Sequence, residues 1–432
     1  MSGGPSGTAA AYRTCDRALD AVRSTGRRWS TWVPGRIEVL GKHTDYAGGR
    51  SLLCALDRGF CVRIAQRRDP MLRVLDVTGR ATYEVMLSPD ATGTPGHWSD
   101  YAATVARRLA RNFPKLPRGA DVAFVSDLPV AAGMSSSSAL LIAIFLGLSR
   151  ANRLSARADY RRAIAMNEDL AAYLGAMENG RPFGRLRGDA GVGTMGGNQD
   201  QVAILCAEAG ALVRYGWSPV RREARIALPK GYVFALASSG VPAPKTGSAM
   251  TRYNHASMAV SRLTAAWNAH SKRRDPMLYD ALVSSPGAEH TLRDLAATLG
   301  DAQFTKAFMV SRLEQFIEET TEIVPAACDA LARGALAEFG VLVDRSQRLA
   351  KDKLGNQIAE TVALQRHARE LGAVAASAFG AGFGGSVWAL VPQAGARVFL
   401  SRWRSSYLRA HPEHAGTAEF FLSSAGQPAH SF

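Results

Sequence analysis

The sequence predicts an α+β fold of two domains. Its 432 residues are 47% hydrophobic and 21% charged, which is ordinary globular composition in a chain long enough to bury two cores. Strand-like segments dominate the opening stretch, and a largely helical stretch runs from about residue 257 to residue 371. Because strands and helices are grouped and do not alternate regularly, we expect a mixed sheet backed by helices.

The expected elements follow the spacing of apolar residues. Five apolar runs predict strands in the opening stretch, at residues 32–40, 59–65, 72–77, 83–87 and 121–126. Helical spacing follows at 138–149 and 160–174, and strands are expected again at 202–205, 211–214 and 232–237. After the helical stretch the chain returns to strand at 385–391 and 417–422. Glycine and arginine are frequent between 175 and 197, which indicates a loop or an insertion.

The net charge of +15 makes nucleic acid a partner to consider. The basic residues are spread along the chain in short groups such as Arg67-Arg68 and Arg107-Arg108, without a basic helix or an aromatic-basic ladder. We therefore expect solvated basic faces and no nucleic-acid partner. A positive field weakly favours an anionic ligand such as ATP or a charged sugar.

Cysteine usage and hydropathy indicate a cytoplasmic protein. The five cysteines are scattered without metal-ligand spacing, which favours reduced thiols over disulfides or a zinc site. No apolar run is long enough to cross a bilayer, so we expect no membrane partner. The first dozen residues lack the charged and apolar regions of a secretion signal.

Residues 34–49 place a compact polar cluster after an apolar strand. The cluster comprises Lys42, His43, Thr44, Asp45 and Tyr46, and two glycines permit the turn that follows. Such a cluster suits a small polyhydroxylated ligand, because one carboxylate accepts hydrogen bonds from two neighbouring hydroxyls. A polar hairpin turn after an edge strand is the alternative.

Residues 128–140 have the composition of a phosphate-binding loop. Small residues lead into a run of four serines, and a nearly all-apolar helix is expected to follow. Small side chains let the backbone approach an anion, a helix start offers unpaired N–H groups, and hydroxyls bind phosphate oxygens or Mg²⁺. The segment has neither the Gly-Lys-Ser/Thr ending of a Walker loop nor a dinucleotide-binding pattern. A serine N-cap with extra serines is the alternative.

Two further segments have features of a ligand site. Asp200 follows a glycine pair and precedes an expected strand, and an aspartate near a phosphate loop suits a general base. Residues 378–386 form a glycine-dense turn, which usually marks close backbone approach. Neither feature is specific alone, because aspartate and glycine are common in surface turns.

Residues 34–49, 128–140 and 379–386 resemble, in this order, three motifs of the galactokinase branch of the GHMP small-molecule kinases. The motifs are the galactokinase signature, the phosphate loop and the C-terminal glycine motif, and the similarity extends over nearly the whole chain. It implies an N-terminal domain of the ribosomal-S5-domain-2-like type and a ferredoxin-like C-terminal domain, with the active site in the cleft between them. We assign residues 1–215 and 216–432 to these domains.

The resemblance also implies roles for individual residues. Asp200 matches the catalytic aspartate and Arg36 the arginine beside it, which would keep the aspartate ionised and offset charge on the transferred phosphoryl group. Trp98 matches the aromatic residue that packs on adenine. The positions that match ligands of the triphosphate are Gly133, Ser135, Ser136, Ser137 and Ser138. The Mg²⁺ ligands are matched by Ser137 and Glu168, and the sugar contacts by Lys42, His43, Asp45, Gly197 and Tyr253.

One departure from the family concerns the substrate. Lys42 stands where galactokinases have a glutamate that accepts a hydrogen bond from the far end of the sugar, and a lysine cannot accept one. We therefore hypothesise a sugar with an anionic far-end group, such as a uronic acid or a long-chain sugar phosphate. Lys245 and Arg252 would add to the positive charge. The alternative is that Lys42 turns to solvent and a neutral hexose binds.

A second departure is the long separation in sequence between Glu168 and Asp200. The extra segment, residues 173–190, carries Arg181, Arg185 and Arg187. Because it is inserted between a metal ligand and the base, we expect it to border the substrate pocket.

The expected activity is that of an ATP- and Mg²⁺-dependent sugar 1-kinase that acts as a monomer or homodimer on a small-molecule sugar. An ordinary galactokinase that tolerates the lysine is the alternative within this class. A catalytically silent sugar sensor is the alternative from another class. The retained set of catalytic and metal-binding matches favours the enzyme.

Overall fold

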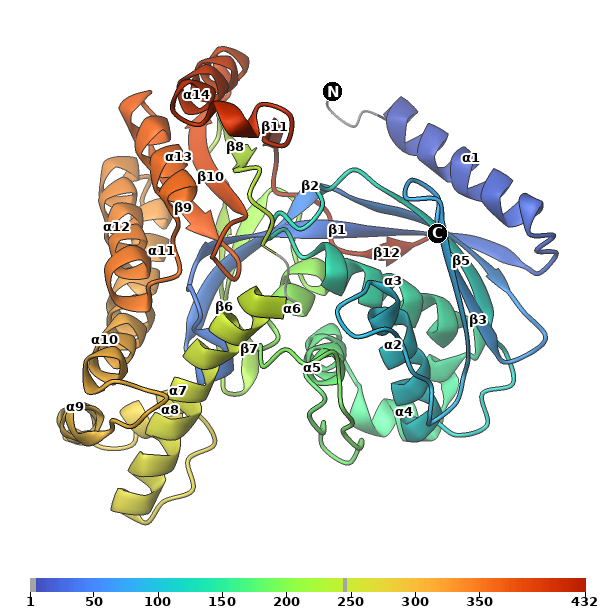
Figure 1. Ribbon diagram of the computed structural model, residues 1–432, viewed down its shortest axis with the longest axis horizontal. Helices are drawn as coiled ribbons and strands as arrows, with labels where there is room; N and C mark the ends of the chain where they lie inside the picture. The colour runs from blue at the N-terminus through green and yellow to red at the C-terminus, as the bar shows by residue number, and fades with distance from the viewer. Residues whose placement is uncertain (1–4, 244–246) are drawn as a thin grey trace.

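Two β-sheets organise the chain (Figure 1). The computed structural model describes residues 5–243 and 247–432, so Lys245 lies outside the described residues. Within the described part of the chain, the larger sheet has eight strands and the smaller sheet has four. Helices pack against both, which confirms the α+β prediction.

The larger sheet is built around two long antiparallel neighbours, β1 (Arg28–Leu40) and β2 (Arg50–Gln66). The strand order is β12-β1-β2-β5-β3-β4, and β6 and β7 extend from β2. β3 and β5 run parallel, whereas the other pairs described are antiparallel. The remaining strands are β3 (Met71–Asp76), β4 (Ala81–Met86), β5 (Ala120–Ser126), β6 (Ala211–Trp217), β7 (Val220–Ala227) and β12 (His430–Ser431).

The smaller sheet is antiparallel throughout, with the order β11-β8-β10-β9. Its strands are β8 (Tyr232–Ser238), β9 (Ala375–Phe379), β10 (Ser386–Pro392) and β11 (Glu419–Ser423). α13 (Ala359–Glu370) and α14 (Ala396–Ala410) share one apolar core with this sheet. Leu364 from α13, and Trp403 and Tyr407 from α14, are the large side chains that these two helices bury in it.

Helices lie on both faces of the larger sheet. α1 (Pro5–Ala21) packs on one face, where Cys15 and Leu19 meet Ala65 and Ala123. α3 (Ser136–Ala151) packs on the other face with α2 (Ser99–Asn112) beside it. The apolar run of α3 is buried almost all round, which explains why its sequence shows little amphipathic pattern.

The remaining helices continue the chain between and after the strands. They are α4 (Ala158–Ala163), α5 (Asn167–Glu178), α6 (Gln199–Leu205), α7 (Gly247–Ser271), α8 (Leu278–Leu282), α9 (Ala288–Thr298), α10 (Lys306–Ile317), α11 (Val324–Ala332) and α12 (Leu336–Leu349). The segments Glu318–Ile323 and Ala350–Leu354 are π-helical turns. α7 to α10 form a core of their own, which includes Tyr46 and Ala47 from the turn after β1.

Several predictions of secondary structure were wrong at their edges, and one was wrong in type. The strand expected at 202–205 belongs to α6, where the Val202 N–H donates to the Asn198 carbonyl at 3.0 Å. Short apolar runs do not distinguish a buried helix from a strand. The helix expected at 160–174 is divided into α4 and α5. Residues 175–178, expected in a loop, complete α5.

The expected domain boundary at 215/216 falls within β6. β7 lies beyond it and pairs with β6, and the C-terminal strand β12 returns to pair with β1. The larger sheet therefore takes strands from both assigned segments. The division into residues 1–215 and 216–432 stays a proposal.

The described helices include none that is both long and apolar enough to span a bilayer. The five cysteines are free thiols, and four of them are buried. Burial raises the pKa of the Cys15 and Cys61 thiols to about 12.

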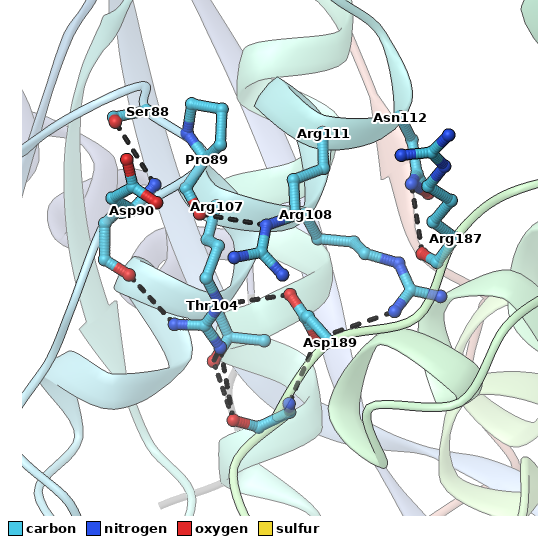
Figure 2. Close-up of polar contacts among 12 residues, drawn as sticks. Ser88, Pro89, Asp90, Thr104, Arg107, Arg108, Arg111, Asn112, Arg187 and Asp189 are labelled. Atoms are coloured by element: carbon cyan, nitrogen blue, oxygen red, sulfur yellow. Dashed lines mark hydrogen bonds and ion pairs between the residues drawn. The ribbon is translucent and has the colours of Figure 1, made fainter.

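Residues 179–191 form a loop that is fastened to α2 through Asp189, as Figure 2 shows. The buried Asp189 carboxylate pairs with Arg107 at 3.0 Å and with Arg108 at 3.5 Å. Arg108 also donates to the carbonyl of Arg181. Two guanidinium groups on one helix therefore share a single carboxylate from the loop, and both charges are removed from water with it.

Replacing this carboxylate should destabilise the fold. We expect Asp189→Asn to lower the free energy of unfolding by about 3–5 kcal/mol, because two buried arginines lose their counter-ion. Urea denaturation measures the effect. Glu338→Gln is the matched control, since Glu338 pairs with Arg333 on the surface and such pairs contribute about 0–1 kcal/mol. Equal midpoints for Asp189→Asn and the parent would contradict the assigned role of Asp189.

Candidate active site

Arg36 brings three distant segments together. On β1, Ile37 and Val39 point into the core, so Arg36 and Glu38 point to the opposite side of the strand. The Arg36 Nε donates to Asp200 Oδ1 at 2.8 Å, and Nη2 lies 2.8 Å from the same oxygen. Nη1 donates to the Gly133 carbonyl at 2.6 Å. The structure thus places the expected pair Arg36 and Asp200 in contact, at the edge of the serine loop.

Asp200 reaches this position because it lies in the first turn of α6. The preceding residue, Gln199, anchors that turn by donating its backbone N–H to Asp45 Oδ2 at 3.3 Å. Gly197 also fits there without a side chain, because a Cβ atom would overlap the Asp45 carboxylate. The close approach of the Asp45 turn therefore requires a glycine at position 197, whereas a Cβ atom on Gly196 would lie 2.8 Å from the Tyr253 hydroxyl.

The serine loop is held between β5 and α3 by the C-terminal glycine turn. Ser386 donates to the Ala132 carbonyl at 2.6 Å, and a Cβ atom on Gly380 would lie 2.8 Å from the Gly133 oxygen. Gly133 has a φ of 74° and Ser135 a φ of 61°, so the loop turns sharply before the helix begins. The expected loop and glycine motifs therefore pack on each other.

The start of α3 has the features of an anion site. Its first N–H groups lack helical partners, and the helix dipole is positive at this end. The Ser135 hydroxyl is buried and has no hydrogen-bond partner among the described residues. Ser136 and Ser137 follow it, half-buried, in the first turn. This donor set fits a phosphate group.

Glu178, and not Glu168, is the glutamate at this site. Ser138 Oγ lies 2.8 Å from Glu178 Oε2 and 3.3 Å from Asp200 Oδ2. Glu178 ends α5 and Glu168 begins it, which separates the two by about 15 Å along the helix axis. Glu168 contacts the Tyr215 hydroxyl at 3.4 Å instead. Glu168 is not one of the residues that line the cavity, whereas Glu178 is. Both ends of one helix carry a glutamate, and only packing distinguishes them, so the metal ligand that was predicted at Glu168 is proposed below at Glu178.

The oxygens of Glu178, Asp200 and Ser138 fit a hard divalent cation. Carboxylate and hydroxyl oxygens are the ligands that Mg²⁺ prefers. The Gln201 side chain donates to Glu178 Oε2 at 2.6 Å, which orients this carboxylate toward Ser138. The expected ligand Ser137 precedes Ser138 on the same turn, and its role stays a prediction.

The expected sugar-contacting residues His43, Asp45, Gly197 and Tyr253 line one cavity together with Arg36 and Asp200. His43 Nε2 lies 3.0 Å from the Ala381 carbonyl and Nδ1 lies 2.8 Å from the Tyr46 hydroxyl. The carbonyl can only accept, so Nε2 carries the proton. The Tyr253 ring packs on His43 with 5.1 Å between ring centroids, and burial raises the pKa of Tyr253.

Lys42 does not reach the cavity. Its side chain is buried, with the residue 1% exposed, and Nζ donates to Ser346 Oγ at 2.9 Å. Ser346 in turn donates to Glu319 Oε1 at 2.9 Å, which also accepts from the Gly41 N–H at 2.8 Å. Burial lowers the pKa of Lys42, and the nearby Glu319 carboxylate opposes that shift.

This position corrects the substrate hypothesis based on Lys42. The ammonium group faces Ser346 and the Glu319 turn, so it offers no charge to a ligand in the cavity. The alternative of a lysine turned to solvent was also wrong. Arg252, the other expected positive group that is described, stacks its guanidinium on the Phe383 ring at 4.4 Å and is not one of the residues lining the cavity.

Glu38 is a cavity residue that the sequence analysis missed. It is 3% exposed and lines the cavity beside Arg36 and Asp45. Burial raises the pKa of Glu38 to about 7, against the lowering effect of Arg36 and Lys42. The signal in the sequence was its spacing, since a strand residue two positions from Arg36 lies on the same face.

The cavity lining is acidic overall. Its charged groups are the Arg36 guanidinium and four carboxyl groups, which belong to Glu38, Asp45, Glu178 and Asp200. A carboxylate or phosphate on the far end of a sugar would meet repulsion in this cavity.

The remaining expected site features lie around this cavity. Trp98 precedes α2, half-buried, with its ring edge-on to Tyr83 at 6.2 Å between centroids, and its contact with adenine stays a prediction. Of the segment 173–190, Glu178 and Asn179 line the cavity, and Arg181 lines a neighbouring groove that shares Asp45. Asp189 is instead fastened to α2. The segment thus borders the site only through its first part.

Known proteins resemble this chain over most of its length. The galactokinase galactose-binding signature matches residues 25–66, the GHMP kinase N-terminal domain residues 100–181 and the GHMP kinase C-terminal domain residues 327–409. The galactokinase of Chloroflexus aggregans is 28% identical over 378 residues, which are 87% of each chain. That of Roseiflexus sp. is 25% identical over 395 residues, covering 91% of this chain and 90% of the relative.

Solved structures share the fold. Lactococcus lactis galactokinase complexed with galactose has a TM-score of 0.79 at 20% identity, and the alignment covers 97% of this chain and 98% of that one. The mevalonate kinase of L. major in complex with R-mevalonate has a TM-score of 0.55 at 15% identity, and the alignment covers 92% of this chain and 96% of that one.

The burial of Lys42 predicts a low chemical reactivity. We expect an acetylating reagent to modify Lys42 at least ~10-fold more slowly than Lys351 in the native protein, because a buried amine reacts only after local opening. Mass spectrometry of peptides from a labelling time course measures both rates. Lys351 is the internal control, since its side chain is 58% exposed. Equal labelling rates would contradict the buried position of Lys42.

Proposed function

This chain belongs to the galactokinase branch of the GHMP kinase family and is a sugar kinase, and from that premise we propose that it phosphorylates the anomeric hydroxyl of a galactose-like sugar with ATP. The observation that carries this proposal is the contact of Arg36 with both Asp200 and the serine loop. The Arg36 guanidinium therefore contacts both the Asp200 carboxylate at the cavity and the loop that leads into the anion site at the start of α3.

Asp200 is the proposed base. One oxygen is bound by Arg36 and the other faces Ser138, so the carboxylate is held at the boundary between the cavity and the loop. It would accept the proton of the sugar hydroxyl as that oxygen attacks phosphorus. The Arg36 guanidinium stabilises the carboxylate charge and offsets the negative charge that develops on the phosphoryl group.

The serine loop and Glu178 are the proposed nucleotide site. The Ser135 hydroxyl and the first N–H groups of α3 would bind phosphate oxygens, and Glu178 with Ser138 would hold Mg²⁺. The ion, when bound, neutralises negative charge on the phosphates. Trp98 is proposed to pack on adenine. These assignments rest on the unpartnered hydroxyl of Ser135 and on the orientation of Glu178.

Asp45, His43, Gly197 and Tyr253 are the proposed sugar contacts. Asp45 would accept hydrogen bonds from adjacent ring hydroxyls, while His43 and Tyr253 form an aromatic wall beside it. The excess of carboxyl groups in the lining supports a neutral sugar such as galactose. We further propose that the enzyme is cytoplasmic, which its free thiols favour, and that it acts as a monomer or homodimer.

Phosphoryl transfer is tested by ADP release from ATP and Mg²⁺ with a panel of hexoses and uronic acids. We expect sugar-dependent ADP release with neutral galactose-like sugars, and a 1-phosphate product by phosphorus NMR. Asp200→Asn should lower kcat about 10²- to 10⁴-fold, because general base catalysis contributes this much. Asp294→Asn is the matched control, since Asp294 is exposed. Sugar binding without ADP release in the parent would instead indicate the silent sensor.

The reassigned metal ligand gives a second prediction. Glu178→Gln should raise the Mg²⁺ concentration for half-maximal rate about 10- to 100-fold, because it removes a charged ligand oxygen. Glu168→Gln removes the same charge at the other end of α5 and should change this concentration less than about twofold. Magnesium titrations of the two variants measure the difference. The reverse order of effects would restore Glu168 as the ligand.

A further inference from the structure

Glu38 has one carboxylate oxygen that nothing in the protein satisfies. Its Oε2 accepts from the Gln199 side chain, whereas its Oε1 is buried and has no hydrogen-bond partner among the described residues. A buried acceptor without a partner is unfavourable, and in this case the residue lines the proposed sugar cavity. A donor group on a bound ligand would relieve that cost.

The position of this carboxylate is fixed by its neighbours. Gln199 Oε1 accepts from Ser51 Oγ at 3.1 Å, and Ser51 itself accepts from Trp217 Nε1 at 3.1 Å. The Gln199 side chain is therefore oriented to donate to Glu38, while its backbone N–H donates to Asp45. One glutamine thus holds two carboxylates at the cavity wall, and a preorganised acceptor binds a ligand with little loss of side-chain entropy.

We infer that Glu38 is a specificity-determining residue for the sugar, and that its free Oε1 accepts a hydrogen bond from a donor group of the bound substrate. The donor is a hydroxyl in a neutral hexose and an ammonium in an amino sugar. This inference rests on the proposed function, because it assumes that the cavity binds a sugar. Glu38 would then be a second carboxylate, beside Asp45, that accepts a hydrogen bond from the sugar.

The charges around Glu38 make this contact sensitive to pH. Arg36 and Lys42 from the same segment favour its ionised form, and Asp45 opposes it. Desolvation is the largest effect and raises the pKa of Glu38 to about 7. A donor on the sugar favours the carboxylate over the protonated acid, so the sugar should bind more tightly above pH 7 and more weakly as the pH falls below it.

The test is isothermal calorimetry of sugar binding without ATP, using the best hexose, its monodeoxy analogues and its amino analogue. For the parent protein at pH 8, we expect removal of one particular hydroxyl to weaken binding about 10- to 100-fold. This loss should shrink at pH 6. In Glu38→Gln the same deoxy sugar should lose less than about threefold relative to the full sugar, with little pH dependence. Tighter binding of the amino sugar would identify an ammonium as the donor.

Glu168→Gln is the matched control, because it removes a carboxylate outside the cavity and should keep the full discrimination. Circular dichroism and urea denaturation establish that Glu38→Gln is folded, and the pH dependence of the parent tests the contact without any variant. Equal discrimination by the parent and Glu38→Gln, or a flat pH profile in the parent, would overturn the inference. Because calorimetry needs no phosphoryl transfer, a protein that binds sugar but releases no ADP would refute the kinase proposal alone.

Discussion

The site depends on the ion pair between Arg36 and Asp200. Both groups are largely removed from water, and a buried charge is tolerated only when it is paired and hydrogen-bonded. Arg36 meets that requirement with Asp200 on α6 and with the Gly133 carbonyl in the serine loop. The strand that carries the arginine is therefore connected to the loop and to the base by the same side chain, and the positions of all three are linked.

The core makes this arrangement possible by fixing one strand. β1 pairs with β2 along its length and places Ile37 and Val39 in the apolar core. Because successive side chains of a strand point to opposite faces, Arg36 and Glu38 then point to the cavity side. A shift of one residue in register would exchange the two sets of side chains, so the hydrophobic packing of β1 also specifies the polar face of the site.

The order of Glu38 and Lys42 in the sequence does not indicate which of the two side chains lines the cavity. Lys42 follows the strand that lines the cavity but turns into a buried network with Ser346 and Glu319. Glu38 comes earlier on the strand and is one of the residues that line the cavity. The positive charge of Lys42 lowers the pKa of Glu38 and so favours its ionised form. The cavity keeps an acidic lining that suits hydroxyl donors and opposes anionic sugars.

The sequence by itself determined the fold class, the kinase family and the set of motifs that meet at the site. Arg36, Asp45, His43, Gly197 and Asp200 were assigned through the resemblance of their segments to galactokinase motifs, because such motifs depend on residue type and order. The tertiary structure alone decided the direction of Lys42, the position of Glu178 beside Ser138 and of Glu168 away from it, the cavity position of Glu38 and the helical state of residues 202–205. In each case the local sequence is compatible with either placement. Only contacts with residues far away in the chain, such as Ser346 with Lys42 or Ser138 with Glu178, distinguish them, and a single sequence does not contain those contacts.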